Sequence, residues 1–120
     1  MFQKFAVTLL VALTLTGCAT PIPMTDVEMT PYDKDTEYAV TPLPNGFSIA
    51  VNYSRYQFFP ESSAVATACK SILTFIAYEQ ADKQGRKIQP INEQRIRISM
   101  GRNGVGITSC SALAFAEWQN

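Results

Sequence analysis

The side chains of this chain that could do covalent chemistry are its three cysteines, Cys18, Cys69 and Cys110. Their usual activating partner is missing, because the sequence contains no histidine. That removes the commonest general base, the commonest metal ligand and any Cys-His nucleophile pair. Cys69 and Cys110 also lack the Cys-x-x-Cys spacing of a redox pair, and no spacing nominates a pair of carboxylates. The sequence therefore predicts a protein that is not an enzyme and that uses neither a cofactor nor a metal ion.

The first cysteine follows a short apolar leader. Lys4 supplies one positive charge, and an apolar run from Phe5 to Leu15 comes after it. This run is far shorter than the roughly 20 residues that cross a bilayer, so it indicates an export signal. Leu15-Thr16-Gly17-Cys18 ends the leader and resembles the bacterial lipobox.

The resemblance to bacterial lipoproteins implies that residues 1–17 are a signal peptide that is removed. Cys18 would then carry a diacylglyceryl group and an acylated amine, with palmitate among the chains, and several chains hold a protein firmly on a membrane. Ala19 follows the cysteine, where Asp would retain the protein, and implies an outer-membrane anchor facing the periplasm. An ordinary secretory leader with an incidental cysteine is the alternative.

The two remaining cysteines are expected to pair. Once Cys18 is bound to lipid, Cys69 and Cys110 are the only other thiols, and the envelope is a compartment that oxidises thiols. Cys69 lies on the apolar face of a predicted helix, and Cys110 lies on a predicted strand. We predict a structural disulfide that fixes this helix over a sheet. Inert buried thiols or one reactive cysteine are the alternatives.

Composition divides the mature chain into two parts. Residues 18–45 hold five of the seven prolines and five acidic residues against Lys34 alone. Few large apolar residues lie there, so burial cannot offset the entropy of ordering the segment. We predict an extended tether, which at about 3 Å per residue would hold the domain several nanometres from the bilayer. The alternative is that residues 37–41 dock as an edge strand. Residues 46–120 are dense in apolar side chains and predict one globular domain.

The predicted domain begins with a strand and a helix. Apolar and polar residues alternate over 47–53, and a bulge or a strand end is expected near Arg55. Apolar residues then recur at helical spacing over 65–76. They predict a helix that begins near Pro60 and ends shortly before Gly85, which can take the left-handed closing conformation.

A hairpin completes the predicted domain. Alternation over 96–100 predicts a second strand, an Asn-Gly pair predicts a tight turn, and a third strand is expected from Val105 to Phe115. A three-residue loop at 102–104 places Cys110 opposite Ile96 and turns the cysteine toward the core. A two-residue loop would turn it outward. The predicted disulfide favours the first register.

These pieces predict an α+β fold of β-α-β-β order, with one helix packed on a three- to four-stranded mixed sheet. The long crossover makes the first and second strands parallel, and the third strand is expected between them, antiparallel to both. One helix cannot cover both faces of a sheet, so we expect apolar side chains on the open face.

Three arginines form the predicted site for an anionic ligand. Arg95 and Arg97 share one face of the second strand, and Arg102 lies at the turn. Because guanidinium groups bind phosphates and carboxylates, the ligands considered are lipopolysaccharide and peptidoglycan. The alternative is a solvated face, or an edge protected by charge against unwanted strand pairing. The glycine-rich turn lies between strands and lacks the Walker lysine, so it predicts no phosphate loop.

The anchor, the acidic segment and the disulfide-linked domain together resemble small outer-membrane lipoproteins. The leading hypothesis is therefore a non-enzymatic binding or scaffolding module, accessory to a secretion or envelope-assembly machine. Its partners would be the membrane, through Cys18, and an envelope protein or a second copy of the chain, but no nucleic acid. A binder of anionic envelope ligands is the first alternative, and a small periplasmic hydrolase is the second.

Overall fold

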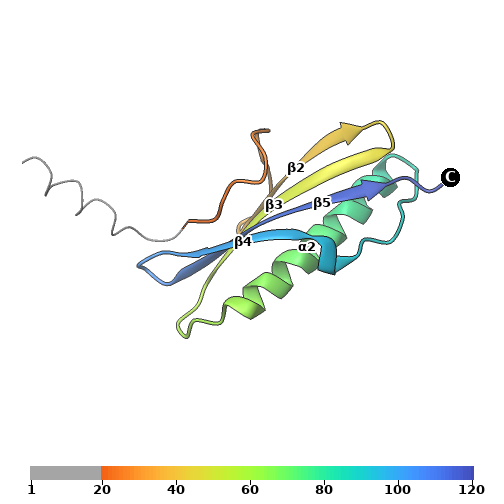
Figure 1. Cartoon of the computed structure of the whole chain (residues 1–120). Coiled ribbons are helices and arrows are strands. Elements are labelled where there is room, and N and C mark those ends of the chain that lie inside the picture. The colour runs from red at the N-terminus through yellow and green to blue at the C-terminus, as the bar shows by residue number, and fades with distance from the viewer. Residues whose placement is uncertain (1–19) are drawn as a thin grey trace, which may run out of the picture.

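One helix lies across one face of an antiparallel sheet in the computed structural model, which describes residues 20–120 (Figure 1). The strands lie in the order β1-β2-β3-β5-β4. The elements in chain order are β1 (Thr30–Asp33), β2 (Thr36–Leu43), β3 (Gly46–Tyr56), α2 (Ser62–Lys83), the 3-10 helix η3 (Glu93–Arg95), β4 (Arg97–Arg102) and β5 (Ile107–Glu117).

The helix α2 forms where the apolar spacing predicts it. It begins at Ser62, directly after Pro60 and Glu61, and ends at Lys83. Gly85 follows with a φ of 67°, in the left-handed region that closes many helices. The side chains that α2 buries recur at helical spacing and are Val65, Cys69, Leu73, Ile76, Ala77 and Ala81. The predicted helix is therefore confirmed.

The α+β class is confirmed, but the predicted sheet is wrong in two respects. The sheet has five strands instead of three or four, and it is not mixed, because every neighbouring pair is antiparallel. The strands β3 and β4 do run in the same direction, as the long crossover requires, but β5 lies between them. Parallel strands are therefore never hydrogen-bonded to each other here.

The two additional strands come from the segment predicted as a tether. Residues 30–43 form β1 and β2, and β2 pairs with β3 along its whole length. This pairing extends well beyond the edge strand at residues 37–41 that was the alternative. Thr36 is buried, and Tyr38 and Val40 pack against the core. The segment therefore buries apolar surface and satisfies its backbone groups on β3, which its acidic and Pro-rich composition does not reveal.

The hairpin between β4 and β5 differs from the predicted register. Met100 lies opposite Cys110, whereas the predicted partner of Cys110 was Ile96. The observed and predicted partners therefore differ by four residues. An even shift leaves every side chain on the same face, because side chains of a strand alternate with a period of two. Cys110 therefore still faces the core, while the predicted pairing itself is wrong.

The polar side chain in the turn explains this shift. The Asn103 N–H donates to the carbonyl oxygen of Ile107 (3.0 Å), and Asn103 Oδ1 accepts from the Ile107 N–H (3.0 Å). The loop therefore spans 104–106 instead of 102–104. Gly106 has a φ of 94° and supplies the left-handed residue that a three-residue hairpin loop needs.

The predicted disulfide between Cys69 and Cys110 is confirmed. It joins α2 to β5, and the two Cα atoms are 6.4 Å apart. Both cysteines are buried in the core between the helix and the sheet. On the same face of β5 the other buried side chains are small, which lets the helix lie close to the strand. They are Thr108, Ala112, Ala114 and Ala116.

The segment before β1 lies along the sheet face opposite α2. The Ile22 N–H donates to Ser99 Oγ of β4 (2.9 Å), and the neighbouring β4 residues Ile98 and Met100 pack against the core on the other face. Residues 21–23 therefore lie beside the sheet, and Cys18 lies outside the described residues. No helix within residues 20–120 has both the length and the apolarity that crossing a bilayer requires.

Candidate functional site

The structure brings two of the three predicted arginines together and separates the third. Arg95 ends η3, Arg97 begins β4, and both side chains are exposed. Arg102 ends β4 and is half-buried. Positions 97 and 102 differ by an odd number, so their side chains lie on opposite faces of the strand. The three arginines therefore do not form one face.

Arg102 holds two segments of the domain together. Its Nη1 donates to Thr108 Oγ1 (2.9 Å) and its Nη2 donates to the carbonyl oxygen of Gln57 (2.9 Å). Gln57 lies in the connection between β3 and α2, and Thr108 lies on β5. The guanidinium group is thus engaged within the fold, and ligand binding by Arg102 stays a prediction.

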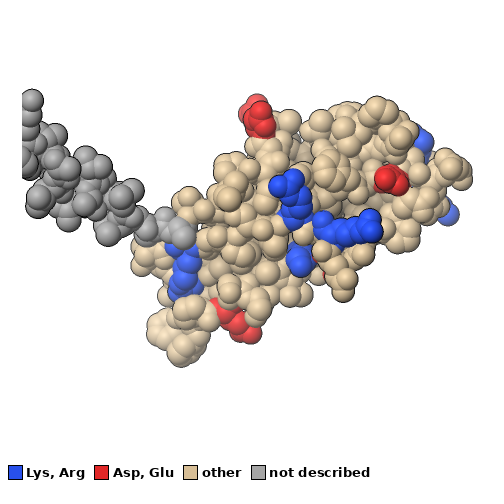
Figure 2. Space-filling view, viewed as in Figure 1, with Lys and Arg blue, Asp and Glu red and all other residues tan. Residues whose placement is uncertain are grey.

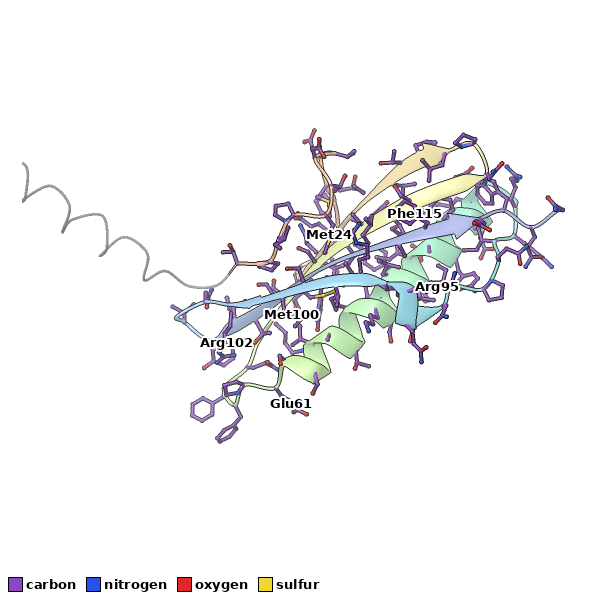
Figure 3. All side chains as sticks on the ribbon, viewed as in Figure 1. Met24, Glu61, Arg95, Met100, Arg102 and Phe115 are labelled. Carbon is purple, nitrogen blue, oxygen red and sulfur yellow. A yellow bond between two sulfur atoms is a disulfide. The ribbon has the colours of Figure 1, made fainter. Side chains whose placement is uncertain are left out.

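Arg95 lies at a groove of about 410 Å³ between β5 and the connection that leads to β4. Ile96 and Ala114 are buried at its base, and Phe115 on its rim is 61% exposed. Figure 3 labels Arg95 and Phe115, and Figure 2 shows basic side chains gathered around the start of β4. The residues that line the groove are Gln89, Pro90, Ile91, Asn92, Arg95, Ile96, Ala114, Phe115 and Glu117.

The groove exists because the segment between α2 and β4 pairs with β5 at two separate points and bends away from it between them. The Gln89 N–H donates to the carbonyl oxygen of Glu117 (2.7 Å), and β4 begins to pair at Arg97, opposite Leu113. Phe115 lies between these two contacts. Alternate residues of an antiparallel strand direct their N–H and C=O groups to the same side, so those of Phe115 point into the groove. Within residues 20–120, no backbone group pairs with Phe115 on this side.

A larger hollow of about 530 Å³ lies on the open face of the sheet, beside the N-terminal segment. Three of its polar side chains are paired across the strands, while the buried Thr36 Oγ1 has no hydrogen-bond partner among residues 20–120. Asn52 Nδ2 donates to Glu37 Oε1 (3.0 Å), and Ser111 Oγ donates to Asn52 Oδ1 (2.8 Å). Nor is any group of three metal-ligating side chains found among residues 20–120. We therefore place the candidate site at the groove, where backbone groups and cations remain free to bind a ligand.

The charges at the groove are unequal along its length. Arg95 lines one part of it, Arg97 follows two residues later on β4, and Glu117 lines the part at the end of β5. Backbone groups that point outward, an exposed aromatic ring and nearby guanidinium groups suit an extended ligand that carries a carboxylate or a phosphate.

The sequence indicated the arginines and predicted apolar side chains on the open face of the sheet, but it did not indicate that an arginine and one of these side chains line the same groove. The groove depends on how the connection 89–96 leaves the sheet, and Pro90 is the one signal for that departure. Proline fixes its φ at about −65°, far from the φ of about −140° in an antiparallel strand, which favours departure of the chain from the sheet at this residue.

No family model matches the chain, and comparisons with curated proteins and with solved structures found no match either.

Proposed function

We propose that this chain is a lipid-anchored protein of the bacterial outer envelope whose domain binds an extended, acidic segment of an envelope partner and catalyses no reaction. The observation that carries the proposal is the unpaired backbone of Phe115 beside Arg95 and Arg97. The lipobox resemblance at Cys18 supports the anchor.

The partner segment would add to the sheet as a short strand. Its backbone would pair with the N–H and C=O of Phe115, which is how many peptides bind an exposed sheet edge. An acidic side chain would accept charge-assisted hydrogen bonds from Arg95 or Arg97, and such bonds are roughly twice as strong as neutral ones. Glu117 would repel a second acid at its end of the groove. The segment should therefore carry its acid at the Arg95 end.

Site-specific photo-crosslinking in intact cells tests the groove. A benzophenone amino acid replaces Phe115 in one variant and Phe75 in the control. Both native side chains are 61% exposed, but Phe75 lies on α2, away from the groove. We expect a discrete protein adduct from position 115 and none from position 75. Adding Arg95→Ala and Arg97→Ala to the first variant should weaken that adduct. Identical adducts from both positions, or none from either, would contradict the proposal.

Mass spectrometry of protein purified from membranes tests the anchor. We expect a mature chain that begins at Cys18 and carries the mass of the diacylglyceryl group and an amine-linked acyl chain. The Cys18→Ser variant should keep its leader and lack the lipid. An unmodified full-length chain in the wild type would refute lipidation.

A second candidate function is binding of lipopolysaccharide or peptidoglycan, and the exposure of Arg95 and Arg97 favours it. Attraction between exposed charges is screened by salt. Binding to purified lipopolysaccharide or sacculi should therefore weaken steeply as ionic strength rises and be lost in the Arg95→Ala/Arg97→Ala variant. Phe115→Ala separates the two functions, since it should impair docking of a peptide and leave binding of a charged headgroup unchanged.

A further inference from the structure

We infer that an exposed aromatic tip at one end of the domain inserts into the surface of the bilayer that holds the anchor. The tip consists of Tyr56, Phe58 and Phe59, from the connection between β3 and α2, and Val105, from the β4–β5 hairpin. These side chains are 62%, 75%, 80% and 71% exposed, in that order. The inference rests on the proposed lipidation of Cys18.

The tip is held by backbone contacts that leave its side chains outside the core. The Gln57 N–H donates to the carbonyl oxygen of Gly106 (2.8 Å), which joins the connection to the hairpin. Gln57 is itself buried. Its Oε1 accepts from Thr108 Oγ1 (2.9 Å) and from the Glu61 N–H (3.1 Å). Phe58 and Phe59 follow this fixed residue and pack edge to face, with ring centroids 5.0 Å apart. The two rings are therefore presented together at the surface.

The chain places its proposed anchor at the same end of the molecule. Ile22 is hydrogen-bonded to Ser99 in the middle of β4, and β4 leads directly into the hairpin of the tip. Figure 1 shows residue 20 toward the end of the molecule that carries this hairpin and the β3–α2 connection, while the C-terminus lies at the opposite end.

The length of chain between the anchor and the sheet is short. Cys18 precedes Ile22 by four residues, which span at most about 14 Å when fully extended at roughly 3.5 Å each. Lipidation at Cys18 would therefore bring the hairpin end close to the headgroups. The separation of several nanometres that a tether of residues 18–45 would allow is not available, because residues 22 and 30–43 are bound to the sheet.

The chemistry of the tip suits this position. Aromatic rings bury well at the boundary between headgroups and acyl chains. Arg55, exposed beside the tip, donates from Nε to the Tyr53 hydroxyl (3.0 Å). That contact keeps its cation at the surface, where lipid phosphates lie. Clustered exposed apolar side chains mark surfaces that contact a membrane or another protein. A membrane held next to the tip by the lipid anchor is the occupant that covers it.

Quenching by brominated lipids tests the insertion with the full-length acylated protein. Phe58→Trp is compared with Phe75→Trp, a control on α2 that is likewise exposed. The native Trp118 gives the same background in both proteins. The proteins are reconstituted in vesicles of phosphatidylethanolamine and phosphatidylglycerol whose acyl chains are brominated near the headgroup. Phe59→Trp provides a second probe of the tip.

We expect strong quenching and a blue-shifted emission from the indole introduced at position 58 or 59, and neither from that at position 75. No quenching at 58 and 59, or equal quenching at all three positions, would overturn the inference. A third result would also overturn it. If the protein forms a dimer at higher concentration and the indoles at positions 58 and 59 escape quenching in that dimer, a second copy of the chain, and not the membrane, covers the tip. Failure of the wild-type protein to float with the vesicles would instead refute the anchor, which separates the two proposals.

Discussion

Reduction of the Cys69–Cys110 disulfide should remove about 4 kcal/mol from the free energy of unfolding. The two cysteines are 41 residues apart. For a loop of this size the entropy that a crosslink removes from the unfolded chain is about 13 cal/mol/K, which gives about 4 kcal/mol at room temperature. Domains are commonly stable by about 5–15 kcal/mol in total. The disulfide should therefore supply a large share of the stability of this small domain.

Urea unfolding measures this loss. The single tryptophan, Trp118, packs against Phe47 with ring centroids 5.3 Å apart, so its fluorescence reports unfolding. With a denaturant slope of about 1–2 kcal/mol/M, the midpoint should fall by about 2–4 M urea when the bond is reduced. The sulfurs are buried, so reductant must be added to the unfolded protein before refolding in detergent. The lipid thioether proposed at Cys18 is not reduced by thiols.

The matched control is the Cys69→Ala/Cys110→Ala protein. It should unfold at low urea, and reductant should not move its midpoint. A shift of less than about 0.5 M in the wild type, which corresponds to under about 1 kcal/mol, would refute the loop-closure reasoning. An equal response of the control to reductant would do the same.

The remaining predictions contrast neighbouring positions. Arg102→Ala should destabilise the domain by about 1.5–3 kcal/mol because it removes hydrogen bonds donated by a charged group. Arg97→Ala, on the exposed face, should change the free energy of unfolding by less than about 0.5 kcal/mol; similar urea midpoints would contradict these placements. Leu73→Ala should cost about 2–5 kcal/mol by leaving a core cavity, whereas Phe75→Ala should be nearly neutral, and equal losses in thermal melts would contradict the orientation of α2. Gly106→Ala should cost about 1–3 kcal/mol because its φ of 94° strains other residues; an unchanged Tm would show that the hairpin closes through another loop.

Local patterns predicted the elements best. The spacing of apolar residues located α2, because an α-helix has 3.6 residues per turn whatever element packs against it. The alternation around β3 located that strand, which ends at Tyr56, one residue after the expected strand end at Arg55. The cysteine count indicated the disulfide. The lipobox and the leader lie outside the described residues and stay predictions.

Pairings between distant segments were predicted less well. Residues 30–43 read as a tether because acids and prolines dominate them, yet β3 offers a complete set of backbone partners. The observed hairpin register differs from the predicted one by four residues, because the side chain of Asn103 closes a loop at 104–106. Arg102 was grouped with Arg95 and Arg97, although it bonds to Gln57, 45 residues away.

The sequence by itself determined where the helix lies and which side of β5 faces it, and it predicted the disulfide that joins them. These features follow from side-chain periodicity and from counting, so they need no knowledge of distant contacts. Only the tertiary structure decided that five strands form the sheet, that Arg95 meets Phe115 at a groove, and that the aromatic tip lies at the end where the N-terminal segment leaves. Each of these features depends on hydrogen bonds between backbone groups that lie far apart in the sequence. Local composition does not specify which strand another strand pairs with.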